Sequence, residues 1–115
     1  MKLSEKQRLF TKLQAEFVLW AFENGFELTD GDAHRDRRVF GAMGEKMGYG
    51  HRNSNHKRRL ARDYNLFIND TYQVTSEAHA PLGEKWKTMH ELARWGGDFP
   101  TPDGNHYSME HGGNQ

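Results

Sequence analysis

A long amphipathic run at the start of the chain most constrains its fold. Apolar side chains recur there at intervals of three and four residues, which places them on one face of a helix: Phe10, Leu13, Phe17, Trp20 and Ala21. Ser4 and Gln7 form the pattern of a capping box, and Gly25 is a suitable stop. We therefore expect a helix within residues 1–25, with its apolar face buried in a core.

The rest of the chain favours short strands around a second helix. Residues 60–68 alternate in polarity, Asn69-Asp70 is a turn signal, and residues 71–74 suit the return strand of a hairpin. Further short strands are expected at 26–29 and 106–110. A second helix is expected from Pro81, with one apolar face and a stop at its end: Leu82, Trp86, Met89, Leu92 and Ala93, then Trp95-Gly96-Gly97. This pattern predicts an α+β fold, an antiparallel sheet with two or three helices packed around it.

The length of 115 residues suits one domain, residues 1–115. Residues 31–55 are rich in glycine and predict a long surface loop, and residues 111–115 predict a flexible tail. No apolar stretch approaches the ~20 residues of a membrane span. The charged start lacks the apolar core of a signal peptide, so we expect synthesis in the cytoplasm without its own signal. Nothing in the sequence demands more than a monomer.

Composition limits the chemistry of any site. The chain has no cysteine, which excludes disulfides and thiolate metal sites. A metal site must therefore use histidine, aspartate and glutamate. The formal net charge is zero, which argues against a protein devoted to nucleic acid through its overall field.

Two short segments hold a candidate metal site on the predicted sheet. His56 and Asp63 lie in the first segment, and Asp103 and His106 in the second. Two imidazoles and a carboxylate suit a catalytic zinc that keeps one position open for water. The remaining acid, Asp103, is placed to act as a proton acceptor.

The spacing of His56 and Asp63 requires a bend. Seven residues separate them, which is about 10 Å along a helix and puts them on opposite faces of a strand. We therefore expect His56 on the loop that enters the strand and Asp63 inside the strand. Ser108 and Glu110 share the face of His106 on the last strand, where either can orient a ligand.

Other interpretations remain open from spacing alone. Seven histidines produce chance His/Asp spacings, and the remaining five read as ordinary histidines: His34, His51, His79, His90 and His111. A basic cluster suits phosphate contacts, a solvated face or an anionic cell wall: Arg52, Lys57, Arg58, Arg59 and Arg62. A His/Asn nuclease is suggested by Asn53, Asn55 and Asn105, without a full motif.

The two segments resemble the motifs of peptidase family M15. These are zinc enzymes, D-Ala-D-Ala carboxypeptidases and L-alanyl-D-glutamate endopeptidases, that cut peptidoglycan stem peptides. The family pattern Ser-x-His-x-x-Gly-x-Ala-x-Asp matches at Ser54, His56, Ala61 and Asp63, with Arg59 in place of the glycine that suits a close turn. Asp103 and His106 resemble the closing motif. Trp95-Gly96-Gly97-Asp98 resembles phage members, and residues 32–36 resemble a segment whose arginine faces the substrate.

The resemblance implies a role for each residue. Zn²⁺ is held by His56, Asp63 and His106. Asp103 takes a proton from the attacking water and passes it to the leaving amine. Arg35 stabilises the oxyanion, and Ser54 holds substrate or caps a turn. Glu110 is the reserve proton acceptor.

The resemblance also implies a partner and a place of action. The substrate is a stem peptide of the bacterial cell wall, reached by a holin-type route or on a phage particle. The size and start of the chain fit phage endolysin-like members, and no stable nucleic-acid partner or membrane insertion is expected. The alternative is a non-catalytic relative, either a structural phage component or a wall-binding module.

Overall fold

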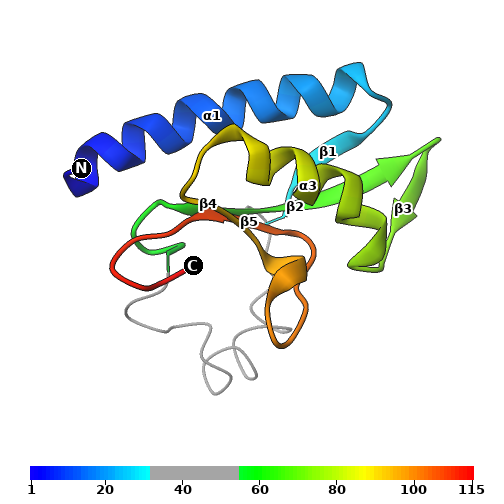
Figure 1. Cartoon of the computed structure of the whole chain (residues 1–115). Helices are drawn as coiled ribbons and strands as arrows, with labels where there is room; N and C mark the ends of the chain where they lie inside the picture. The colour runs from blue at the N-terminus through cyan, green and yellow to red at the C-terminus, as the bar shows by residue number, and fades with distance from the viewer. Residues whose placement is uncertain (32–54) are drawn as a thin grey trace.

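The computed structural model describes residues 1–31 and 55–115. Two helices and five strands make up most of this part of the chain: α1 (Leu3–Glu23), β1 (Glu27–Asp30), β2 (Ala61–Ile68), β3 (Thr71–Gln73), α3 (Ala80–Met89), β4 (Ala93–Trp95) and β5 (His106–Met109). Short 3-10 turns, η1 (Glu77–His79) and η2 (Gly96–Asp98), precede α3 and follow β4. The arrangement confirms the predicted α+β fold (Figure 1).

All strand pairs in the sheet are antiparallel. The strand order is β1-β2-β5-β4, and β3 pairs with β2. Strand β2 pairs with three other strands. Its first residues pair with β5, and its last residues pair with β1 and β3. The hairpin between β2 and β3 turns at Asn69 and Asp70, both with positive φ, as predicted from their turn chemistry.

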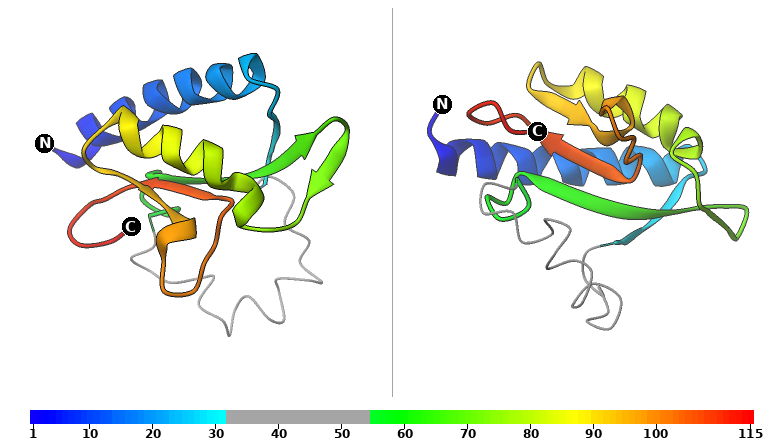
Figure 2. Two further views of the ribbon diagram at one scale, coloured as in Figure 1. Left: turned by 45° about the vertical axis from the view of Figure 1, so that its right-hand side comes forward. Right: turned by 90° about the horizontal axis from the view of Figure 1, so that it is seen from below.

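Both helices cover the same face of the sheet (Figures 1 and 2). Phe17 of α1 is fully buried, and its ring lies 5.0 Å from that of Tyr107, 5.6 Å from Trp86 and 6.2 Å from Tyr64. Tyr64 and Tyr107 come from neighbouring strands β2 and β5. The contacts of this aromatic cluster therefore pack α1 and α3 against the centre of the sheet.

Two predicted element ends were wrong. Helix α1 is capped at Lys2 and not at Ser4, because the backbone N–H of Lys2 donates to the Glu5 carboxylate at 3.1 Å. Helix α3 ends at Met89, since His90 is already extended. Leu92 therefore lies beyond the helix and Ala93 begins β4, a strand too short to show a period in the sequence.

The predicted loop at 31–55 lies outside the described residues, except for its two end residues. The flexibility expected for residues 111–115 stays a prediction. In the structure His111 and Asn114 exchange backbone hydrogen bonds, both 3.0 Å long. No helix within residues 1–31 and 55–115 is long and apolar enough to cross a membrane.

Replacing Phe17 by alanine should lower the free energy of unfolding by about 3–5 kcal/mol, because it leaves a cavity within the aromatic cluster. Phe22 of the same helix is 47% exposed, so Phe22→Ala is the matched control and should change it by less than about 0.5 kcal/mol. Urea unfolding of both variants measures the difference. Equal losses would show that the cluster does not anchor α1.

Candidate metal centre

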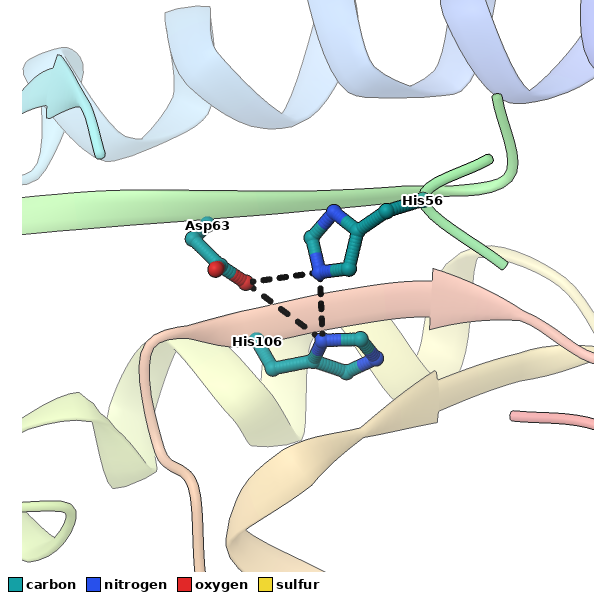
Figure 3. A group of neighbouring side chains, drawn as sticks. All are labelled: His56, Asp63 and His106. Carbon is teal, nitrogen blue, oxygen red and sulfur yellow. Dashed lines mark hydrogen bonds and ion pairs between the residues drawn. The ribbon is translucent and has the colours of Figure 1, made fainter. Parts of the chain in front are cut away.

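The pairing of β2 with β5 places two acid–base side chains directly opposite each other. Asp63 and His106 are partners in the ladder, so their side chains leave the sheet on the same face. Their sequence neighbours Tyr64 and Tyr107 point to the other face, into the aromatic cluster. The candidate site therefore lies on the face of the sheet opposite the helices (Figure 3).

His56 reaches this face from a turn at the entrance to β2. The N–H of Leu60 donates to the carbonyl of Asn55 at 2.7 Å, and the N–H of Arg59 donates to that of His56 at 3.1 Å. These two bonds define a Schellman motif, whose closing residue adopts the left-handed conformation. Arg59 has a φ of 59°. The expected bend between His56 and Asp63 is present, and Arg59 closes it at the position where the family pattern has glycine.

Three donor atoms meet at the site (Figure 3). His56 Nε2 lies 3.2 Å from His106 Nδ1 and 3.3 Å from Asp63 Oδ1, and His106 Nδ1 lies 3.4 Å from Asp63 Oδ1. Tetrahedral zinc with bonds of about 2.0–2.1 Å places its donors roughly 3.3–3.4 Å apart. The triangle therefore has the size of one face of a zinc coordination shell, and the residues fit this ion.

The surroundings keep the carboxylate charged and one imidazole enclosed. Burial by itself raises the pKa of the Asp63 carboxyl, but hydrogen bonds and charges from His106 and His56 outweigh it and hold that pKa well below its usual range. The ring of Phe99 packs on His106 with centroids 5.3 Å apart. Phe99 carries no motif signal in the sequence, because an apolar wall can be built from many positions.

Asp103 stands at the entrance to β5, and its side chain is exposed. Its backbone N–H donates to the carbonyl of Gly96 at 2.9 Å, and its carbonyl accepts the N–H of His106 at 3.0 Å. A Cβ atom at Gly96 would overlap the Asp103 carbonyl oxygen, so glycine is required for this approach. Asp103 is not one of the three clustered donors.

The position of the Trp95 side chain accounts for the second glycine of the Trp-Gly-Gly stretch, Gly97. Its indole lies where a Cβ atom at either Gly83 or Gly97 would overlap it, and its N–H donates to the Gly104 carbonyl at 2.7 Å. The tryptophan therefore ties α3 and η2 to the turn that leads from Asp103 to His106. A polar pocket of about 190 Å³ adjoins this turn, lined by Asp103, Asn105 and residues of the β2–β3 hairpin among others.

The other predicted site residues lie elsewhere or outside the described part. Ser108 is fully buried opposite Ala61 in the ladder, and its role in orienting a ligand stays a prediction. The Glu110 carboxylate accepts the N–H of Gly113 at 2.6 Å, and its role as reserve proton acceptor also stays a prediction. Arg35 and Ser54 fall outside the described residues.

The other described histidines have separate contacts. His79 is buried, which lowers its pKa to about 4, and its Nδ1 lies 2.7 Å from the Tyr107 hydroxyl. His90 Nδ1 accepts the N–H of Leu92 at 3.0 Å, and His111 Nδ1 lies 3.0 Å from the Lys6 ammonium. Among residues 1–31 and 55–115, the group able to hold a metal is His56, Asp63 and His106.

Comparison with protein families gives a match over the segment that contains the candidate site. A family model of peptidase family M15, described as D-alanyl-D-alanine carboxypeptidase, matches residues 48–109, more than half of the chain. The matched range contains the three clustered donors and Asp103. No curated protein shows a significant match to the chain.

Arg59→Gly should raise the free energy of unfolding by about 1 kcal/mol, because glycine adopts the left-handed conformation without the Cβ clash. Arg59→Ala is the control, since it removes the exposed side chain but keeps the Cβ. We expect no gain from alanine. Chemical unfolding measures both variants, and equal stability of the two would mean that backbone strain at this position is negligible.

Proposed function

The chain belongs to peptidase family M15, and on this premise we propose that it is a zinc peptidase that hydrolyses peptidoglycan stem peptides. The observation that supports zinc is the triangle of donors formed by His56, Asp63 and His106. Family membership supports a hydrolase of peptidoglycan-type substrates. The bond cut is that of an L-Ala–D-Glu endopeptidase or a D-Ala carboxypeptidase.

His56 Nε2, Asp63 Oδ1 and His106 Nδ1 would hold the ion, because these are the atoms that converge. Zinc at this site would lower the pKa of water to about 7 and polarise the scissile carbonyl. A charged Asp63 offsets part of the positive charge of the ion. Phe99 shields one side of the His106 ring from water, which strengthens the electrostatic interactions there.

Asp103 acts as the general base and then as the general acid in this proposal. Its carboxylate accepts the proton of the attacking water and delivers it to the nitrogen of the leaving amine. The exposure of its side chain and the short turn to His106 support this role. Arg35 stabilises the oxyanion, and Ser54 holds the substrate.

We also propose a phage-encoded lytic role for residues 1–115 as a single peptidase domain that acts on the bacterial wall as a monomer.

In the basic cluster, Arg62 forms an ion pair with Asp30 at 3.0 Å and Arg58 contacts the His111 carbonyl at 3.4 Å. These contacts give two members of the cluster structural roles. They favour the peptidase over the nucleic-acid alternative.

The metal requirement is tested on purified protein with peptidoglycan stem peptides. We expect mass spectrometry to find one cleaved amide bond, whose position identifies the peptidase type, and a chelator to abolish cleavage until zinc is restored. His56→Ala and His106→Ala should lose bound zinc and activity, whereas His90→Ala should keep both. Intact peptidoglycan and a metal-free wild-type protein would support the non-catalytic wall-binding relative instead.

Asp103→Asn should lower kcat by about 10²–10⁴-fold, because the amide cannot accept the proton of water. Its zinc content should be unchanged, since Asp103 is outside the donor triangle. Asp98→Asn is the matched control, because Asp98 pairs with Lys87 at 2.8 Å. A wild-type rate for Asp103→Asn would remove Asp103 from the mechanism.

A further inference from the structure

The turn that carries His56 is attached to strand β5 by the side chain of Asn55. This amide is only 2% exposed. Its Nδ2 donates to the Met109 carbonyl at 2.9 Å and to the Asn114 carbonyl at 3.1 Å. The backbone carbonyl of Asn55 also receives the Leu60 N–H that closes the Schellman motif. Asn55 thus connects the turn, β5 and the C-terminal residues.

His56 needs such an attachment more than the other two donors do. Asp63 and His106 face each other within a ladder, and their side chains are 4% and 9% exposed. His56 lies outside the ladder, and its side chain is 30% exposed. The position of its imidazole beside His106 therefore depends on how the turn is docked onto the strand.

The acceptors of the Asn55 amide are themselves fixed. Met109 is on the same strand as His106, and its N–H donates to the Leu60 carbonyl at 2.9 Å. Asn114 belongs to the C-terminal turn, residues 110–114, which closes through the mutual bonds of His111 and Asn114. Lys6 of α1 donates to the Glu110 carbonyl at 3.0 Å and so ties this turn to the helix. Asn55 therefore rests on two anchored carbonyl groups.

We propose that Asn55 is a positioning residue that sets the zinc affinity of the site by holding His56 against His106. This inference rests on the proposed zinc function. Without the two hydrogen bonds, binding the ion must first order the turn, and residues that orient a metal ligand typically account for 10–100-fold in affinity. The donor set itself is intact in an Asn55 variant, so a zinc-saturated variant should retain its kcat.

The test compares two buried amides. Gln14 of α1 is 1% exposed and hydrogen bonded to the Tyr64 hydroxyl, on the helix-covered face of the sheet. Asn55→Ala and Gln14→Ala should both lower the unfolding free energy of the metal-free protein. Competition with a chelator should show a zinc Kd raised about 10–100-fold for Asn55→Ala and unchanged for Gln14→Ala. Activity of Asn55→Ala should return to near the wild-type kcat at saturating zinc.

Asn55→Leu provides a second variant, because its side chain has about the size and shape of asparagine but donates no hydrogen bond. We expect a Kd close to that of Asn55→Ala. If Asn55→Ala does not fold without metal, titrating its refolding with zinc gives the affinity by mass action. An unchanged Kd in both Asn55 variants, or an equal rise for Gln14→Ala, would overturn the inference while the zinc function stands. A wild-type protein that binds no zinc would instead overturn the proposed function.

Discussion

The register between β2 and β5 is the constraint on which both the core and the site depend. Because Asp63 pairs with His106, their side chains meet on one face of the sheet. The same register puts Tyr64 and Tyr107 on the other face, against Phe17. A slip by one residue would exchange the two faces and lose both arrangements. Packing of α1 and α3 on the aromatic cluster therefore also holds two of the three donors in place.

The fold gives a structural reason for the glycine positions in the family motifs. The glycine position of the first motif is a left-handed turn residue, and Arg59 occupies it with the same backbone conformation. The bend is therefore present although arginine occupies the glycine position. In the Trp-Gly-Gly stretch, Gly96 admits the Asp103 carbonyl and Gly97 admits the Trp95 indole. These residues shape the approach to His106 and lie outside the donor triangle.

Histidines in different parts of this fold have different roles. His79 is enclosed in the core and bonded to Tyr107, so burial keeps it neutral over the physiological range of pH. His56 and His106 lie beside a buried carboxylate on the opposite face. The difference follows from the face of the sheet and the neighbouring charge. Spacing in the sequence shows neither of these, although the resemblance to a family separated His56 and His106 from the other histidines.

The sequence by itself determined the α+β class, the helix at the N-terminus, the β2–β3 hairpin and the need for a bend before Asp63. These features depend on local periodicity and turn chemistry, which act over a few residues. Only the tertiary structure decided that β4 forms and that Asn55 links the His56 turn to β5 and the C-terminal turn. A three-residue strand exists because β5 is beside it, and a buried amide finds its acceptors more than 50 residues away. Such contacts depend on which segments become neighbours, and that is a property of the whole fold.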